Sequence, residues 1–155
     1  MSEDQQQQQQ EGRQLFCRVI APEQALYDGE ADLVIARIGD GDIGVMVDHA
    51  PLVSTVEIGA VRINQDDERY VFATSDGFFK VSDNLVQILV EEAQPVEEID
   101  VDAAESRVEE AENELSQVSE EDEEGERQKQ EIERRRSIAE NLVKVAREYG
   151  EGQGG

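Results

Sequence analysis

The sequence predicts a β + α fold, in which an N-terminal antiparallel β-sandwich is followed by a C-terminal two-helix antiparallel hairpin. The first observation is a two-residue period that begins at Leu15, because Leu15, Cys17 and Val19 fall on one face of an extended chain. The second is a change of period after Pro95, where apolar residues recur at alternating steps of three and four. The short apolar runs before Pro95 have no helical pattern between them, which favours a sandwich or barrel.

The elements follow in order along the chain. Residues 1–14 are polar and glutamine-rich, and we expect them to be disordered because they bury too little apolar surface to offset the entropy of ordering. The sandwich is expected over residues 15–95, with turns that include Tyr27-Asp28-Gly29 and Gly39-Asp40-Gly41. Its strands are rich in Val, Ile, Phe, Tyr and Thr. Beyond 15–19, the predicted runs are 33–38, 43–47, 52–58, 60–63, 70–74, 78–82 and 85–90.

The helical hairpin is expected over residues 96–150. Asp100 or Asp102 suits the N-terminus of the first helix, and residues 119–125 predict the turn, with Gly125 in a left-handed conformation. Both apolar stripes are narrow, so the hairpin needs the sandwich or a partner for stability. A flexible glycine-rich tail is expected at 151–155. The stripes consist of Val101, Ala104, Val108, Ala111, Leu115 and Val118 in the first helix, and Ile132, Ile138, Ala139, Leu142, Val143, Ala146 and Tyr149 in the second.

The net charge of −24 comes from 38 acidic and 14 basic residues among 155. This balance argues against nucleic-acid binding, which depends on lysine and arginine displacing counterions, and against direct adsorption to anionic lipids. A single cysteine, Cys17, indicates a reducing compartment. The sequence shows neither a secretion signal nor a run of apolar residues that could span a membrane, so we expect a soluble intracellular protein.

The sequence offers no catalytic site and no metal or cofactor site. Cys17 and His49 could be proposed as a thiol–imidazole pair, but Cys17 lies inside a predicted strand, where nothing lowers its pKa. Residues 39–44 match the dinucleotide signature G-x-G-x-x-G, but a strand rather than a helix is expected after them. The same segment begins like a calcium loop, but its twelfth position is Pro51 instead of glutamate. One histidine and one cysteine cannot form a zinc site.

Several segments, in order over about residues 15–105, resemble the epsilon subunit of the rotary proton-translocating ATP synthase. The His49-Ala50-Pro51-Leu52 segment after the glycine turn is the most specific of them. The other segments are Val19-Ile20-Ala21-Pro22-Glu23, Leu26-Tyr27-Asp28-Gly29-Glu30-Ala31-Asp32, Gly41-Asp42-Ile43-Gly44, Ile58-Gly59-Ala60-Val61-Arg62-Ile63, Ser75-Asp76-Gly77-Phe78, Glu91-Glu92-Ala93 and Glu98-Ile99-Asp100.

The resemblance implies a non-catalytic subunit of the central stalk, peripheral to the cytoplasmic face of the cell membrane. Its sandwich would bind the gamma subunit and touch the ring of c subunits, with Asp42 and His49 at the ring. Its membrane association would thus be indirect, through the complex. Its C-terminal helices would restrain ATP hydrolysis by reaching the alpha and beta subunits. The basic residues expected at this catalytic head are Arg127, Arg134, Arg135 and Arg136; pairing within the helix, with Glu131, Glu133 or Glu140, is the alternative.

Three segments depart from the family pattern. Val47-Asp48 replaces the usual proline-glycine before the histidine, so the turn can differ and a negative charge is added. Ser75-Asp76-Gly77 replaces serine-glycine-glycine. The family's ATP-binding motif is degenerate at Ile99, Asp100, Ala103 and Ala104, because Ala103 stands where an arginine would meet the phosphates, so we expect weak ATP binding or none.

Two other functional classes fit parts of the sequence. Residues 97–126 hold 15 acids and one base, which fits an acidic interaction module that binds a basic partner in a salt-dependent way. A small nucleotide-dependent enzyme would use the glycine-rich turn and requires a helix after Gly44. The charge excess in both parts of the chain also suggests adaptation to a salt-rich cytoplasm.

Overall fold

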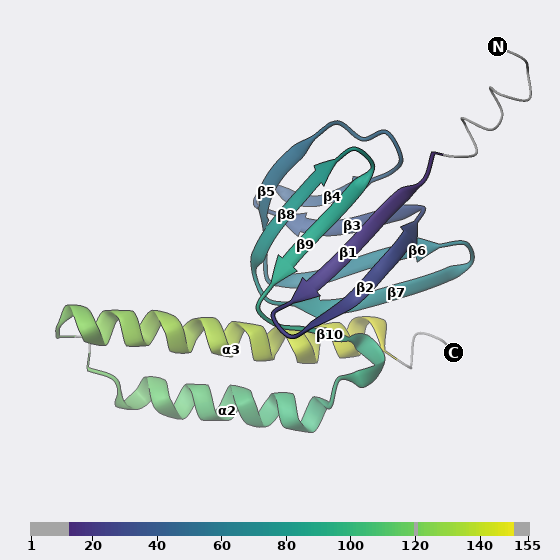
Figure 1. The fold of residues 1–155 in the computed structure, drawn as a ribbon. Helices are drawn as coiled ribbons and strands as arrows, with labels where there is room; N and C mark the ends of the chain where they lie inside the picture. Colours follow the sequence, from purple (N-terminus) through teal and green to yellow (C-terminus); the bar gives the residue numbers. More distant parts are fainter. Residues whose placement is uncertain (1–12, 120, 151–155) are drawn as a thin grey trace, which may run out of the picture. The chain divides into compact units, whose positions relative to one another are not determined.

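The computed structural model describes residues 13–119 and 121–150, and the chain divides into two compact units between Ala93 and Gln94. The expectations for residues 1–12 and for the tail at 151–155 lie outside the described residues. The first unit is built of strands and the second of helices (Figure 1). The predicted β-sandwich followed by two helices is therefore confirmed.

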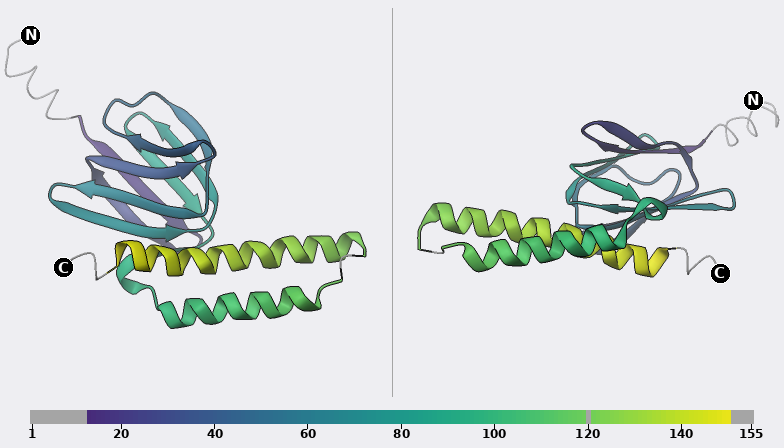
Figure 2. Two further views of the ribbon diagram at one scale, coloured as in Figure 1. Left: turned by 180° about the vertical axis from the view of Figure 1, so that it is seen from behind. Right: turned by 90° about the horizontal axis from the view of Figure 1, so that it is seen from below.

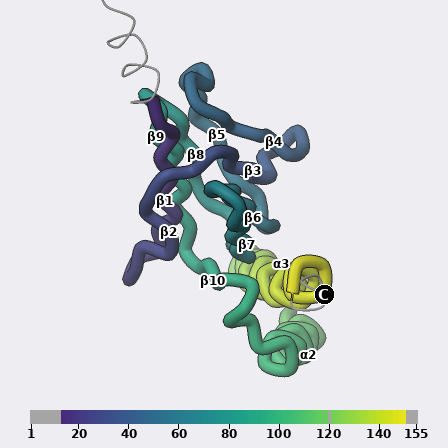
Figure 3. The backbone as a smooth tube through the Cα atoms, turned by 90° about the vertical axis from the view of Figure 1, so that its right-hand side faces the viewer, coloured from purple at the N-terminus to yellow at the C-terminus, as the bar shows by residue number. Residues whose placement is uncertain are grey.

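The sandwich consists of two five-stranded sheets. One sheet has the order β2-β1-β9-β8-β5 and the other the order β10-β7-β6-β3-β4. Figure 3 shows β1, β2, β8 and β9 in one layer and β3, β4, β6 and β7 in the other. The strands are β1 (Leu15–Ala21), β2 (Gln24–Ala31), β3 (Leu33–Ile38), β4 (Gly41–Val45), β5 (Leu52–Val56), β6 (Gly59–Gln65), β7 (Glu68–Thr74), β8 (Gly77–Ser82), β9 (Leu85–Val90) and β10 (Ala93–Pro95).

The second strand, β2, is where the sequence prediction was wrong. Tyr27-Asp28-Gly29 was expected to form a turn, but these residues lie inside β2 and pair with Val19, Arg18 and Cys17 of β1. A local turn signal is overridden here by pairing with the neighbouring strand. Strand β1 also pairs in parallel with β9, so the sandwich contains one parallel pair among its antiparallel ones.

The core of the sandwich is mostly aliphatic, as the low aromatic content requires. Alternate residues of β1 point into it, so Leu15, Cys17 and Val19 are at most 2% exposed. Phe79 is the largest fully buried side chain. Tyr27 packs edge-on against Tyr70 with ring centroids 5.2 Å apart, which links β2 to β7 across the two sheets.

The second unit contains a short 3₁₀ helix, η1 (Val96–Glu98), and the helices α2 (Val101–Gln117) and α3 (Glu123–Tyr149). The two α-helices run side by side and antiparallel (Figures 1 and 2). Asp100 caps α2, because its carboxylate accepts a hydrogen bond from the N–H of Ala103 at 3.1 Å. Asp122 caps α3 in the same way through Gly125 at 2.7 Å.

The expectation of a left-handed Gly125 was wrong. Gly125 lies in the first turn of α3, and Gly41 is the glycine that takes a positive φ in the described part of the chain. The glycine is needed at 125 for another reason: a Cβ there would lie 1.7 Å from the carbonyl oxygen of Ser119. A close approach of two backbone segments therefore selects the residue.

The apolar stripes are only partly buried. In α2, Ala104 and Ala111 are buried, while the larger side chains of the stripe are half-buried. In α3, Val145 is buried although the sequence analysis left it out, and Val143 and Ala146 are half-buried. The stripe on α3 is therefore rotated slightly from the predicted one.

Candidate functional site

The outer surface of the β2-β1-β9-β8-β5 sheet carries large apolar side chains in contact with solvent. Since alternate residues of a strand point to opposite faces, the neighbours of the buried core residues form this outer face. We define the apolar face as Phe16, Val53, Phe78 and Leu89, whose exposed fractions are 45, 71, 64 and 45%. They come from β1, β5, β8 and β9, four strands that are adjacent in the sheet.

Strand register places Phe78 and Leu89 directly side by side, whereas Val53 pairs with Lys80 and Phe16 pairs with Leu85, so that a polar row separates Phe16 from Phe78 and Leu89. Phe78 pairs with Leu89, and Leu89 pairs with the half-buried Ile20 of β1, so apolar side chains form a row across three strands. A polar row lies beside it, in which Lys80 pairs with Gln87 and Gln87 with Arg18. An exposed apolar row of this kind, with polar residues beside it, is typical of protein–protein interfaces.

The sequence pattern does not predict this apolar face. Phe78 and Phe79 are consecutive, and residues 85–90 are almost continuously apolar, so the alternation did not separate a core face from a polar one. A strand that is apolar on both faces at the surface of a two-layer sandwich is the signal that could have found it.

Asp42, one of the two residues predicted to contact a membrane-embedded ring, lies in β4 beside two arginines. Its Oδ1 is 3.4 Å from Nε of Arg37, and its Oδ2 is 3.6 Å from Nη2 of Arg62. Arg62 is the more buried of the two, with a side-chain exposure of 24%. The Asp42 side chain is 49% exposed, and its carboxylate is held by ion pairs with Arg37 of β3 and Arg62 of β6.

His49, the other predicted contact, lies in the loop between β4 and β5. The N–H of His49 donates to the carbonyl of Met46 at 3.2 Å, which closes a turn over residues 46–49. Nδ1 of the ring is 2.7 Å from the carbonyl oxygen of Ala50, and because a carbonyl oxygen only accepts, Nδ1 donates in this contact. Met46 and Val47 in this turn are 60 and 41% exposed.

The structure does not bring Asp42 and His49 into one cluster. Asp42 is at the beginning of β4, next to the β3–β4 turn, whereas the His49 turn starts where β4 ends. Each therefore belongs to a different end of that strand. Asp48 has a φ of 65°, so this turn has the backbone conformation that glycine adopts most easily, even though the residue is an aspartate.

The glycine-rich segment 39–44 does not form a phosphate-binding loop. Gly41 has a φ of 125°, as expected for a turn glycine, and residues 41–45 form β4. Gly44 pairs with Ile35 of β3, where a nucleotide loop would require the first turn of a helix. The helix that a nucleotide-dependent enzyme using this turn would require after Gly44 is therefore not formed.

Two of the four arginines predicted to contact the catalytic head, Arg135 and Arg136, form ion pairs. Arg135 pairs with Glu114 of α2, and Arg136 pairs with Glu140 one turn further along α3 at 3.1 Å. Arg127 is exposed near the start of α3, beside Asp122 and Glu123. The predicted pairing within α3 thus holds for Arg136, whereas Arg135 instead joins the two helices.

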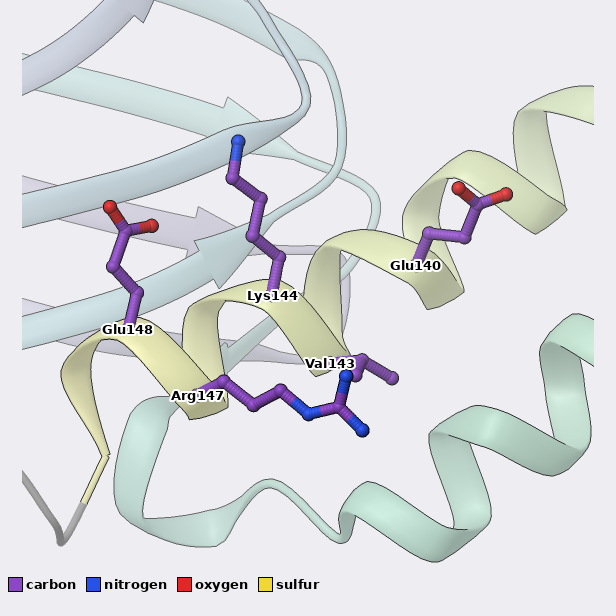
Figure 4. Close-up of a pocket in the computed structure, with 5 residues that line it drawn as sticks. All are labelled: Glu140, Val143, Lys144, Arg147 and Glu148. Carbon is purple, nitrogen blue, oxygen red and sulfur yellow. The ribbon is translucent and has the colours of Figure 1, made fainter.

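An open depression runs along α3 (Figure 4) and is lined by Glu140, Val143, Lys144, Arg147 and Glu148. Arg147 reaches from it to α2, where its Nη2 lies 2.8 Å from Oε1 of Glu105. Since two acids and two bases surround a shallow surface, the depression has neither the enclosure nor the single charge sign of a ligand pocket.

At the N-terminus of α2, the degenerate ATP motif has a structural role. The carboxylate of Asp100 accepts the hydrogen bond that caps the helix, Ala104 is buried, and Ala103 is exposed in the first turn. Asp102 adds a negative charge to that turn.

Cys17 is buried in the sandwich, and burial raises the pKa of its thiol to about 12. A thiol of this kind is a core side chain and a poor nucleophile at neutral pH. Within residues 13–119 and 121–150, no group of three or more potential metal ligands is present. No helix in that same part of the chain is long and apolar enough to cross a bilayer.

The chain is similar to known proteins over most of its length. Residues 14–96 match the family model described as the β-sandwich domain of the ATP synthase delta/epsilon chain. The ATP synthase epsilon chain of Rubrobacter xylanophilus is 64% identical over 143 residues, which cover 92% of this chain and 98% of that one. The epsilon chain of Desulfitobacterium hafniense strain Y51 is 44% identical over 87 residues, or 56% of this chain and 66% of that one.

Two solved structures share the fold. A chain in the Euglena gracilis mitochondrial ATP synthase structure of OSCP, F1 and c-ring has a TM-score of 0.69 at 23% identity, covering 86% of this chain and 81% of that one. A chain in the central stalk and c-ring structure from Tetrahymena thermophila has a TM-score of 0.57 at 12% identity, covering 85% and 96%.

Proposed function

The chain belongs to the ATP synthase delta/epsilon chain family, and on that premise we propose that it is a non-catalytic subunit of the enzyme's central stalk. In this role it couples proton-driven rotation to ATP synthesis, and its C-terminal helices restrain ATP hydrolysis. It is held peripherally at the cytoplasmic face of the membrane through its partners. These partners are the gamma subunit, the ring of c subunits and the alpha and beta subunits.

The observation that carries this proposal is the apolar face. Four large apolar side chains on adjacent strands are exposed to water. A protein partner that covers them gains about 25 cal/mol for each Å² of apolar surface removed from water. We assign this face to the gamma subunit, because a permanent contact of the stalk needs an apolar centre. Arg18 and Lys80 of the polar row lie between Phe16 and the Phe78–Leu89 pair and would meet polar groups of the same partner.

The test uses the full-length chain expressed together with alpha, beta and gamma subunits, without the membrane ring. Phe78→Asp places a charge in the middle of the apolar face, and because Phe78 is 64% exposed the sandwich still folds. We expect this variant to lose co-purification with gamma. Met46→Asp, at a position 60% exposed but in the His49 turn, is the matched control and should co-purify normally. Normal co-purification of Phe78→Asp would refute the assignment.

The contacts with the ring are proposed for Asp42 and the His49 turn. Because these residues belong to different ends of β4, each would meet the ring separately, and Asp42 would do so together with Arg37 and Arg62. Variants at either place should leave assembly with gamma intact and lower the number of protons pumped per ATP hydrolysed by the complete enzyme. Unchanged pumping in Asp42→Ala and His49→Ala would contradict a role at the ring.

The restraint of hydrolysis is proposed for the hairpin, with Arg127, Arg134, Arg135 and Arg136 facing an acidic segment of the catalytic head. To do so, Arg135 and Arg136 exchange their present partners, Glu114 and Glu140, for acidic groups of beta. Such exposed pairs contribute only about 0–1 kcal/mol each, so the exchange costs little. ATP hydrolysis by complexes with the full-length chain should be slower than by complexes truncated after Glu98. Equal rates across salt and nucleotide conditions would remove this role.

A further inference from the structure

Three segments that are distant in the sequence meet at the His49 turn. They are the residue Arg13 just before β1, the turn itself at residues 46–49, and the turn between β8 and β9. Nη1 of Arg13 is 2.8 Å from Oδ2 of Asp48. The N–H of Asp48 donates to Oδ1 of Asn84 at 2.6 Å, and Nδ2 of Asn84 donates back to Oδ1 of Asp48 at 3.3 Å.

Asp48 holds an unfavourable backbone conformation. Its φ of 65° is left-handed, a region that costs residues other than glycine roughly 1 kcal/mol or more, although less for aspartate and asparagine. It is the third residue of the turn closed by the His49 N–H, the position that takes a positive φ in a type II turn. The reciprocal hydrogen bonds with Asn84 offset this cost, since each is worth about 0.5–1.5 kcal/mol.

Asn84 is itself fixed on its own side. Asp83 and Asn84, with φ of 51° and 62°, form the two-residue turn that joins Ser82 of β8 to Leu85 of β9, the arrangement of a type I′ hairpin. The carbonyl of Asn84 also accepts a hydrogen bond from the N–H of Phe16 at 2.8 Å. The amide that holds Asp48 is therefore anchored to β1, β8 and β9, the rigid part of the sandwich.

We propose that the Asp48–Asn84 pair is a clamp that holds the His49 turn in a single conformation ready to dock on the membrane ring. Asp48 and Asn84 are positioning residues in this proposal, because they act through His49 and the exposed Met46 and Val47. Ordering a loop before binding removes an entropic cost that would otherwise weaken the contact. Arg13 contributes less, since its side chain is 62% exposed. The clamp rests on the proposed role of the His49 turn at the ring.

The first test measures the order of the turn in the isolated full-length chain. Asn84→Gly keeps the left-handed backbone and removes the amide, whereas Asp83→Gly makes the same change one residue earlier and leaves the clamp intact. Amide hydrogen exchange by NMR should show about five- to tenfold lower protection of the His49 N–H in Asn84→Gly, the effect of losing hydrogen bonds of this strength. Asp83→Gly should match the parent chain. Equal protection in the two variants would overturn the clamp.

The second test reverses the pair. Asn84→Asp places two carboxylates against each other and should loosen the turn. The double variant Asp48→Asn with Asn84→Asp restores one amide and one carboxylate, with the carboxylate still able to accept the Asp48 main-chain hydrogen bond. We expect protection of the His49 N–H to return in the double variant. No recovery would mean that the pair does not act through its hydrogen bonds, which would overturn the proposal.

The functional readout uses the complete enzyme in lipid vesicles. The number of protons pumped per ATP hydrolysed should fall in Asn84→Gly and Asn84→Asp. It should return to the parent ratio in the double variant and stay at that ratio in the control, Asp83→Gly. If the turn loosens while pumping stays at the parent ratio, the clamp has no positioning role. The proposed stalk function fails on a different measurement, the co-purification of Phe78→Asp with gamma, so the two failures are distinguishable.

Discussion

The first residue of β8, Gly77, leaves no room for a side chain. A Cβ there would lie 2.0 Å from the carbonyl oxygen of Leu89 and 3.0 Å from Cα of Val90. These are backbone atoms of β9, which pairs with β8 on one side and with β1 on the other. They cannot move away without breaking two ladders of hydrogen bonds, so Gly77→Ala should destabilise the sandwich.

The magnitude follows from two opposing effects. Forcing one methyl group into a packed site costs about 1–3 kcal/mol. Alanine also lowers the conformational entropy of the unfolded chain, which raises the free energy of unfolding by about 0.4–1 kcal/mol. We therefore expect a net loss of about 1–2 kcal/mol in the free energy of unfolding, or roughly a 5- to 30-fold lower ratio of folded to unfolded chain. Gly59, the first residue of β6, is the matched control, because the nearest atom to its Cβ would be 3.7 Å away.

The assay is urea unfolding of the full-length chain followed by far-ultraviolet circular dichroism. Gly77→Ala should have a lower midpoint with an unchanged slope, and Gly59→Ala a midpoint equal to or above that of the parent chain. Equal midpoints for the two variants would refute the reasoning, since both replace a glycine at the start of a strand and differ only in the space available.

Three further predictions follow from the charge, the helix cap and the core. The net charge of −24 makes self-repulsion large, so the melting temperature should rise with molar potassium chloride, and a flat or falling curve would contradict the adaptation to a salt-rich cytoplasm. Asp102 and Ala103 at the start of α2 give ATP no cation, so equilibrium dialysis should detect no binding at millimolar concentration; binding at that level would contradict this. Because burial raises the pKa of Cys17 to about 12, iodoacetamide at pH 8 should modify the thiol only after urea unfolds the chain. The contribution of this protonated thiol to the free energy of unfolding should decline as the pH rises from about 8.5, the pKa of an unfolded cysteine, towards 12. Rapid labelling of the native chain at pH 8 would contradict both the protection of the thiol and this pH dependence.

Local periodicity predicted most of the fold. The change of period after Pro95 separated strands from helices correctly, and Asp100, one of the two residues predicted as the cap, is the one that caps α2. Both signals depend only on neighbouring residues, which is why they can be read without a structure. The error at Tyr27-Asp28-Gly29 arose where a turn-like tripeptide is held extended by a strand from elsewhere in the chain.

The candidate surfaces were predicted less completely. Asp42 and His49 came from resemblance to a family, and the structure added that Asp42 lies between two arginines from other strands. The apolar face was missed because Phe78 and Leu89 read as core residues in apolar runs. Whether a residue of such a run faces the core or the solvent depends on which sheet covers it, and that is decided by packing.

The sequence by itself determined the order of sandwich and hairpin, the acidic character and the family, because these depend on composition, short periods and local motifs. Only the tertiary structure decided which partners the polar groups find. Asp48 and Asn84 are 36 residues apart in the chain and Arg135 and Glu114 are 21 apart, yet each pair is in hydrogen-bonding contact. Such contacts arise when strand register and helix packing bring distant segments together, and no local pattern encodes them.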